Sequence, residues 1–248
     1  MPIPIKSKAE IETMRKACSI VRDALNMLED MIAPGVTTGE LDSAIVSLLH
    51  KRRAKPSFKG YRGFPKNCCV SVNNEVIHGI PGIRKLKNGD IVSIDVGAYI
   101  DGFHGDAARS FIVGKGSDEA VRLVDAARMS FFAAVNYAKA GMRLGDLCGS
   151  IEDYCAARGY SVVKDFCGHG IGRDLHEEPQ IPCYREKKRG PKLWPGMTLA
   201  IEPMVCAGNG DVEIMENDWT VITKDGSLSA HYENTVLITD GECEILTL

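Results

Sequence analysis

The 248-residue sequence predicts an α+β fold made of two related α/β halves. Amphipathic helical stretches alternate with strand-like segments in an order that repeats along the chain. Short motifs recur in the same order: Gly35–Leu41 resembles Gly141–Leu147 at an offset of 106, and Gly89–Asp95 resembles Gly196–Glu202 at an offset of 107. Each half therefore supplies a helix pair and an acidic strand pair, and we expect the halves to pack about a pseudo-twofold axis.

The first helix pair is marked by its start and stop signals. One helix is predicted to begin after Ser7, which has a glutamate three positions on, as in a capping box. Apolar residues then recur at helical spacing until Pro34 and Gly35 end the helix. The same capping pattern at Thr37 opens a second amphipathic run, which reaches Leu49.

The later elements follow from periodicity and turn residues. The segment 68–77 alternates like a single strand, and helices are predicted over 117–140 and 144–158. A short strand is expected over 161–166, and the chain from residue 197 onward is strand-like with glycine-containing turns.

The most informative hairpin turns at Asp101-Gly102, a dipeptide that accepts the positive φ angles of a two-residue turn. With that turn at its centre, Asp95 faces residue 108 and Asp106 faces residue 97. Side chains alternate along a strand, so the two aspartates point to the same face as diagonal neighbours. The alternative is an exposed hairpin with solvated acids, which the apolar flanks of both strands disfavour.

The repeat predicts a convergence of acidic side chains. His104-Gly-Asp106 resembles His231-Tyr-Glu233, so the pseudo-twofold axis would bring the four acids of the two strand pairs around one centre: Asp95, Asp106, Glu202 and Glu233. Four buried carboxylates cannot all stay ionised without cations. Oxygen ligands with an imidazole suit Mn²⁺, Fe²⁺, Co²⁺ or Zn²⁺, and carboxylates can bridge two such ions. His169, in a glycine-rich segment, is the candidate imidazole; the alternative is a structural histidine.

Composition limits the function classes. Hydrophobic residues make up 44% of the chain, and the net charge of −3 gives no electrostatic case for a nucleic-acid or membrane partner. No long apolar run follows the N-terminus, so no signal peptide or spanning helix is expected. Nine cysteines without a C-x-x-C pair indicate reduced thiols in a cytoplasmic protein. We expect one catalytic domain over residues 1–248 and, lacking an apolar helix seam, a monomer.

Four motifs together resemble one family: HGIPG from His78, the Asp95/Asp106 hairpin, GHGIGRDLHEEP over 168–179, and IEPM over 201–204. This combination is similar to the short bacterial type I methionine aminopeptidases. The resemblance implies the pita-bread fold, a curved antiparallel sheet covered by helices in two pseudo-symmetric halves. It also implies removal of the initiator methionine from nascent polypeptides before a small second residue, by attack of water activated by two metal ions.

The resemblance also implies roles for individual residues. Two divalent cations would be bound by the five ligand positions, with Asp106 and Glu233 bridging: Asp95, Asp106, His169, Glu202 and Glu233. Glu202 would act as general base, and His78 and His176 would contact the substrate or its tetrahedral intermediate. The alternative is that these two histidines only cap backbone groups in loops.

A methionine side chain needs an apolar, polarisable pocket. The resemblance places six residues in or near that pocket, any of which could instead be plain core: Phe58, Tyr61, Phe64, Cys69, Leu175 and Trp219. The chain departs from better-known relatives at three positions. Phe58 stands where a cysteine is common, Leu175 where an aromatic residue is common, and Gly97 where a threonine is frequent.

Two rival functions remain. Proline-specific aminopeptidases and dipeptidases share the fold but usually carry an extra N-terminal domain, for which 248 residues leave no room. A non-catalytic binding relative would usually have lost metal ligands, whereas all five positions are filled here. Docking on the ribosome near the exit tunnel is an expectation without a clear surface, because 210–218 is acidic. The basic stretch over 185–192 is a substitute candidate, and a solvated loop is its simpler interpretation.

Overall fold

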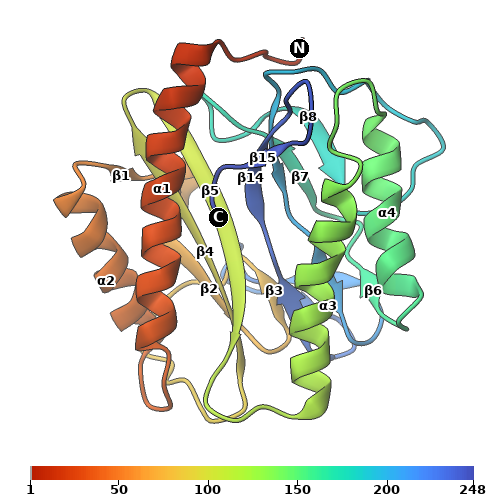
Figure 1. Ribbon diagram of the computed structural model, residues 1–248. Coiled ribbons are helices and arrows are strands. Elements are labelled where there is room, and N and C mark those ends of the chain that lie inside the picture. The colour runs from red at the N-terminus through yellow and green to blue at the C-terminus, as the bar shows by residue number, and fades with distance from the viewer. Residues whose placement is uncertain (1) are drawn as a thin grey trace.

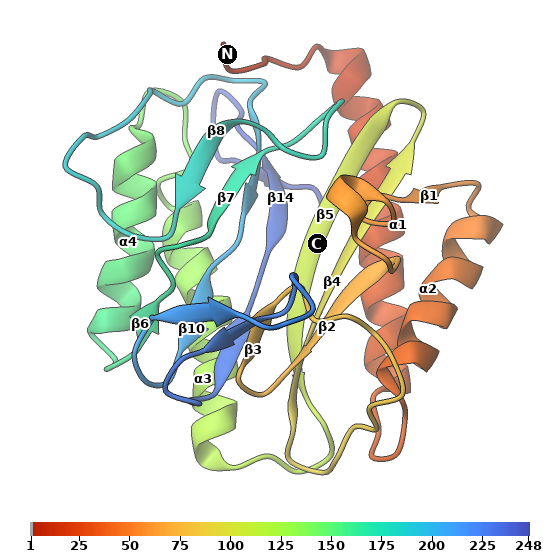
Figure 2. The ribbon, with the colours of Figure 1, turned by 180° about the vertical axis from the view of Figure 1, so that it is seen from behind.

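Four long helices lie on one side of a set of antiparallel strands in the computed structural model, which describes residues 2–248 (Figure 1). The helices are α1 (Lys8–Met31), α2 (Thr38–Lys51), α3 (Asp118–Val135) and α4 (Leu144–Ala156). Seen from behind, the strands and their connecting loops form the other side, which these helices leave uncovered (Figure 2). The fold is the expected α+β arrangement, with α1 and α2 on one half and α3 and α4 on the other.

The strands of the first half are β1 (Lys55–Pro56), β2 (Cys68–Val72), β3 (Glu75–Ile77), β4 (Ile91–Ile100) and β5 (Phe103–Ile112), with a 3₁₀ turn, η1, at Tyr61–Gly63. The others are β6 (Ser161–Val162), β7 (Cys167–Gly170), β8 (Glu177–Pro182), β9 (Thr198–Ile201), β10 (Met204–Cys206), β11 (Val212–Ile214), β12 (Val221–Thr223), β13 (Ser229–His231), β14 (Asn234–Leu237) and β15 (Glu244–Ile245).

Two larger sheets carry the two halves. In the first, β4 pairs with β1, β2 and β5; in the second, the order is β15-β14-β9-β7-β8. Every strand pairing among residues 2–248 is antiparallel, as the sequence predicts. Two further sheets of three strands, β13-β10-β6 and β11-β12-β3, close one end of the molecule.

The predicted capping boxes are confirmed at both helix starts of the first half. The Ser7 and Thr37 side chains accept from the backbone N–H groups of Glu10 and Glu40, whose carboxylates accept in return from the cap backbone. Each box satisfies two N–H groups that a helix start leaves unpaired. The helices therefore begin where the sequence places them.

Element ends were predicted less well. The segment 68–77 is two strands, because Asn73 adopts a left-handed φ of 62° and turns the chain between β2 and β3. Helix α3 stops at Val135, five residues early, where the next amides bond three residues back instead of four. Strand β6 ends at Val162 because β10 offers it only two partner positions.

The repeat is confirmed by matched hydrogen bonds in the two halves. The Gly35 amide donates to the Leu86 carbonyl at 2.8 Å, and the Gly141 amide donates to the Leu193 carbonyl at 2.9 Å. Both glycines have left-handed φ angles, 95° and 84°. The same turn geometry thus ties each helix pair to the segment that precedes β4 or β9.

Among the described residues, the core has one cluster under each helix pair, one between the halves and a smaller fourth one that includes Val76, Met204 and Val221. The central cluster combines residues of both halves, including Phe58, Cys69, Leu175 and Ala200. Its apolar side chains surround the acidic positions described below. Among residues 2–248, no helix is both long enough and apolar enough to cross a membrane.

Candidate metal-binding active site

Strands β4 and β5 present two aspartates to the same face. The register pairs Asp95 with Ala108 and Gly97 with Asp106, as the sequence predicts, and the hairpin turns at Asp101. Asp106 is buried with 4% of its surface exposed. The flanking strand residues are buried, so these acids are not part of a solvated hairpin edge.

The second acidic pair meets the first across the seam between the two sheets. The Glu233 amide donates to the Ala108 carbonyl at 2.9 Å, and the Ala108 amide donates to the Glu233 carbonyl at 3.3 Å. The Thr235 hydroxyl accepts from the Asp106 amide at 3.1 Å and donates to its carbonyl at 2.9 Å. Backbone bonds therefore fix Asp106 and Glu233 relative to each other.

Strand β7 contributes the imidazole. His169 Nδ1 lies 2.9 Å from the Gly170 carbonyl, which can only accept, so Nδ1 carries the proton and Nε2 keeps its lone pair. That Nε2 lies 3.6 Å from Glu202 Oε1. One potential ligand atom from each of Asp106, His169 and Glu233 falls within 4.8 Å of the other two. Such a cluster can hold a divalent cation.

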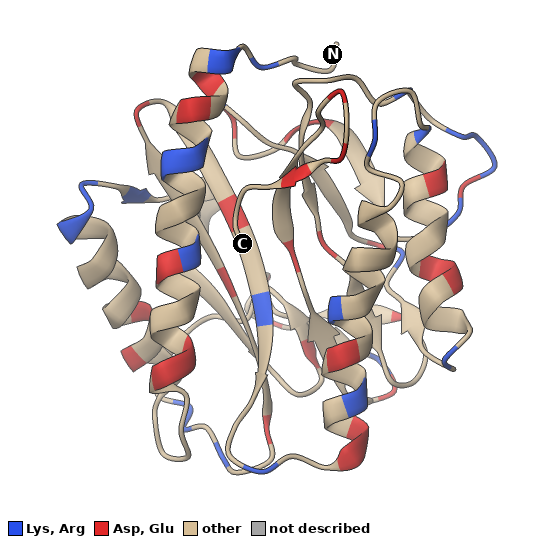
Figure 3. Cartoon of the chain, viewed as in Figure 1, with Lys and Arg blue, Asp and Glu red and all other residues tan. Residues whose placement is uncertain are grey.

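The four carboxylates disfavour each other's charge. Burial and then the charges of neighbouring carboxylates raise the pKa values of Asp106, Glu202 and Glu233 well above normal. Burial raises the pKa of Asp95 to about 7. Figure 3 shows acidic residues on the central strands as well as on the outer helices. Without a cation, this centre holds protons to reduce its charge.

The donor set fits a metal site. Asp95 Oδ1, Asp106 Oδ1 and Glu233 Oε1 are buried and have no hydrogen-bond partner within residues 2–248. Buried polar atoms are normally paired, and three unpaired carboxylate oxygens lining one cavity leave lone pairs free for a ligand. Carboxylates with one imidazole are the donors that Mn²⁺, Fe²⁺, Co²⁺ and Zn²⁺ accept.

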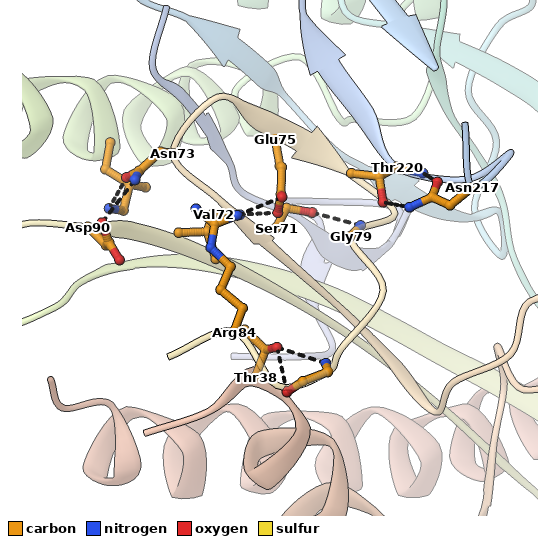
Figure 4. Close-up of polar contacts among 12 residues, drawn as sticks. Thr38, Ser71, Val72, Asn73, Glu75, Gly79, Arg84, Asp90, Asn217 and Thr220 are labelled. Carbon is orange, nitrogen blue, oxygen red and sulfur yellow. Dashed lines mark hydrogen bonds and ion pairs between the residues drawn. The ribbon is translucent and has the colours of Figure 1, made fainter. Parts of the chain in front are cut away.

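His78 is held at one wall of the site by the β2–β3 region. It has a left-handed φ of 58°, which is strained for a residue with a side chain. The next residue is fixed, because the Gly79 amide donates to the Ser71 hydroxyl at 3.1 Å (Figure 4). A Cβ at Gly79 would lie 2.2 Å from the Val70 carbonyl oxygen, so the chain passes where only glycine fits.

The same region is tied to the rest of the sheet by Asn73. Its side chain donates to Asp90 at 2.9 Å and accepts from the Ile91 amide at 2.9 Å (Figure 4). The His78 ring meets Phe166 edge to face at 5.9 Å between centroids. Burial lowers the pKa of His78 to about 4, so its ring is neutral at pH 7 and offers one N–H donor.

His176 occupies the opposite side. Its Nδ1 lies 2.6 Å from the Tyr61 hydroxyl, and its ring centroid is 4.1 Å from that of His169. Loss of hydration and then the charge of Arg62 lower the pKa of His176 to about 4. This histidine is also neutral at pH 7.

All thirteen site residues expected from the sequence line one cavity of about 240 Å³. The carboxylates and His169 form its floor, and the apolar walls are those expected for a thioether pocket: Phe58, Tyr61, Phe64, Cys69, Leu175 and Trp219. The cavity is also lined by residues that sequence reasoning missed, among them Phe166 and Arg62. Phe166 belongs to a predicted strand and Arg62 to a predicted loop, so nothing in the sequence marked either residue as part of a site.

A third missed neighbour is His231, which is 2% exposed. Its Nε2 lies 3.7 Å from Glu202 Oε2 and has no hydrogen-bond partner within the described chain. The sequence showed only that it matches His104 in the repeat. His104 instead lies outside the cavity, with Nδ1 2.9 Å from the Ser57 hydroxyl.

Two of the unusual positions are in contact. A Cβ at Gly97 would lie 2.7 Å from Phe58 Cε1 and 2.7 Å from Ser57 Cβ. Real Cβ atoms do not approach so closely, so the phenylalanine needs the glycine. Gly97 therefore leaves the space that the Phe58 ring occupies beside the cavity.

Comparisons with known proteins show which family the chain is similar to. Residues 12–240 match the model of metallopeptidase family M24. A methionine aminopeptidase of Clostridium acetobutylicum is 53% identical over 247 residues, which cover 99% of each chain. The crystal structure of methionine aminopeptidase from Thermotoga maritima superposes with a TM-score of 0.97 at 46% identity, again covering 99% of each chain.

A prolidase from Pyrococcus furiosus shares the fold at lower similarity. It is 25% identical with a TM-score of 0.78, and the match covers 98% of this chain but only 65% of the prolidase. The remaining third of the prolidase has no counterpart here.

Proposed function

The chain belongs to metallopeptidase family M24, and we propose that it is a methionine aminopeptidase, which removes the initiator methionine from new polypeptides. It is a metal-dependent hydrolase with the pita-bread fold. The proposal rests on one observation: carboxylates whose buried oxygens have no hydrogen-bond partner line the same small cavity as the apolar side chains. A cavity of this size suits one side chain, and its aromatic and sulfur-containing walls suit a thioether.

We propose that the carboxylate cluster and His169 would hold two divalent cations, since ligand atoms of Asp106, His169 and Glu233 already lie within 4.8 Å of one another. When bound, such ions lower the pKa of water and polarise a carbonyl group. The ligand set is Asp95, Asp106, His169, Glu202 and Glu233. The unpaired oxygens of three of these residues support it.

Glu202 is the proposed general base. Burial and then the negative charges of Glu233 and Asp95 raise its pKa, and a carboxylate with a raised pKa is a better proton acceptor than an ordinary one. It can take a proton from the attacking water and pass it to the leaving amine. His78 can donate its single N–H towards the amide nitrogen, and His176 towards the carbonyl oxygen as negative charge develops there.

The substrate is proposed to be the N-terminus of a nascent chain, and the protein to act as a monomer in the cytoplasm. All nine cysteines are free, and seven of them are buried, which agrees with a reducing compartment. A ribosome-facing surface is less well supported, because Arg185 and Arg189 of the basic loop pair with Asp153 and Asp146 of α4.

The test is release of methionine from Met-Ala-Ser and Met-Gly-Met-Met by the metal-loaded protein. We expect rapid release of methionine and negligible cleavage of proline-linked peptides. Glu202→Gln should lower kcat roughly 100- to 10,000-fold, because proton transfer is lost, while the far-UV spectrum stays unchanged. Preferential cleavage before proline would instead assign the chain to the prolidase-like activity. Turnover unaffected by Glu202→Gln would remove that residue as base.

A further inference from the structure

One ion pair in the molecule is unlike the others. Lys6, in the segment before α1, donates from Nζ to Glu177 Oε2 at the start of β8, and their side chains are only 5% and 8% exposed. Every other pair of Lys or Arg with a carboxylate among residues 2–248 has at least one partner that is over a third exposed. Burial of two charges costs desolvation, so the pair is poor evidence of a stabilising role alone.

The second oxygen of Glu177 organises the loop that precedes it. Glu177 Oε1 accepts from the backbone N–H of Arg173 at 2.8 Å and of Asp174 at 3.4 Å. The Gly172 amide donates to the Asp174 carbonyl at 3.1 Å, which closes a tight turn. Charged acceptors make stronger hydrogen bonds than neutral ones, so this carboxylate is the main anchor of the loop.

The packing around the ion pair requires Gly172. A Cβ there would lie 2.4 Å from Lys6 Cε and 2.6 Å from Glu177 Oε1. The glycine carbonyl accepts from the His104 amide of β5 at 2.8 Å, and the Lys6 amide donates to the Gly196 carbonyl at 2.8 Å. The N-terminal segment, the loop and β5 are therefore built together around Lys6.

The anchored loop delivers two residues to the cavity. Leu175 is 3% exposed in its apolar wall, and His176 contacts Tyr61 and His169 as described above. His176 directly precedes Glu177, so it lies on the backbone between the carboxylate and the two amides that the carboxylate accepts from. The metal-ligand positions, in contrast, lie on β4, β5, β7 and the residues that follow β9 and β13.

We propose that Lys6 and Glu177 are positioning residues for His176. The buried ion pair holds the Glu177 carboxylate where it can accept the two loop amides, and the loop in turn holds His176 against the reacting carbonyl. The inference rests on the proposed peptidase function. It assigns a role in turnover to a segment that precedes the first helix and contributes nothing to the metal site.

The test compares Lys6→Met and Glu177→Gln with the parent enzyme on Met-Ala-Ser at saturating metal. We expect kcat to fall roughly 10- to 100-fold with little change in KM or bound metal, because a small displacement of a catalytic group costs that much. Lys6→Arg should retain most of the activity. Lys16→Met, which breaks an exposed pair with Asp101, is the matched control and should leave kcat unchanged.

A double-mutant cycle distinguishes the positioning of His176 by Lys6 from a general effect of Lys6 on the fold. In a His176→Ala background, Lys6→Met should cause no further loss of kcat, because the group that it positions is absent. The Arg173 and Asp174 amides should also exchange hydrogen faster in Lys6→Met. If Lys6→Met unfolds the chain, Glu177→Gln and Lys6→Arg carry the test.

Equal losses of kcat with and without His176 would overturn the proposal, as would full activity in both Lys6→Met and Glu177→Gln. Failure of the parent enzyme to release methionine would instead contradict the proposed function.

Discussion

At the scale of single residues, Gly97 shows how one missing atom shapes the cavity. Its bare Cα lets the segment with Ser57 and Phe58 pass within 2.7 Å of where a Cβ would stand. The phenylalanine ring can then form part of the cavity wall. Pocket shape in this protein thus depends on a backbone position that does not itself line the cavity.

The contact predicts coupled effects on catalysis. Gly97→Ala should lower kcat/KM for Met-Ala-Ser roughly tenfold, because it pushes the Phe58 ring into the cavity. Adding Phe58→Cys should recover part of the loss, although the Ser57 contact remains. Steady-state kinetics of the two single variants and the double variant measure the coupling. If the change in kcat/KM of the double variant equals the product of the changes in the two single variants, the two positions act independently.

Some site residues could be predicted because their chemistry leaves a signal in the sequence. Carboxylates between apolar strands are costly, so Asp95 and Asp106 stand out among the residues around them. Phe166 and His231 leave no such signal, because an aromatic residue or a lone histidine is ordinarily part of a core. Only the three-dimensional packing brings them beside His78 and Glu202.

At the scale of elements, equivalent turns join the two helices of each pair. Gly35 and Gly141 have left-handed φ angles, and no atom lies within 4 Å of the position that a Cβ would occupy at either residue. An alanine at either position would therefore meet backbone strain but no clash. Because the repeat matches their surroundings, the two glycines offer an internal comparison within one chain.

We expect Gly35→Ala and Gly141→Ala to lower the free energy of unfolding by about 1–2 kcal/mol each, since a left-handed conformation costs that much for a residue with a Cβ. Gly82→Ala, with neither a positive φ nor a close neighbour, is the control and should be near neutral. Urea unfolding measures all three. A lower free energy of unfolding in one of these two variants but not in the other would contradict the equivalence of the turns.

The starts of α1 and α2 were predictable because capping is local: a hydroxyl and a glutamate three residues apart determine each of them. Helix ends were not predictable. Helix α3 stops where the next amides donate to carbonyls three residues back instead of four, and no residue type marks that change. The split of 68–77 was missed for a similar reason. Asn73 can turn the chain, but its decisive bonds are to Asp90 and Ile91, far along the sequence.

At the scale of the whole molecule, the acidic centre is a destabilising element that a cation converts into a stabilising one. Folding brings four carboxylates together and raises their pKa values. A group with a raised folded-state pKa favours folding when protonated, and loses that contribution as the pH rises through the folded-state value. For Asp95, the relevant pKa values are 3.8 in the unfolded chain and about 7 in the fold.

Chelated protein should therefore melt at a lower temperature than metal-loaded protein, with the difference growing from pH 6.5 to pH 8. In the upper part of this range the buried histidines, whose folded-state pKa values are lowered (to about 4 for His78), are largely neutral in both the folded and the unfolded chain. Scanning calorimetry at several pH values, with metal content verified, measures the difference. Melting temperatures that do not respond to metal removal would contradict a buried carboxylate centre.

The overall architecture followed from the repeat, because duplicated motifs imply duplicated halves whatever the details of their strands. The way in which the two halves meet could not be predicted from the repeat. That junction depends on reciprocal bonds between Ala108 and Glu233, which no sequence pattern marks.

The seam has a consequence for how such a molecule could arise. A polypeptide of half this length would carry only two of the four acids and would have to enclose an ion by associating with a second copy of itself. In a single chain the two halves can differ: one supplies His169, and the other the long β4–β5 hairpin. One chain thus does what two identical subunits would otherwise have to do, with its acidic centre where the two halves meet.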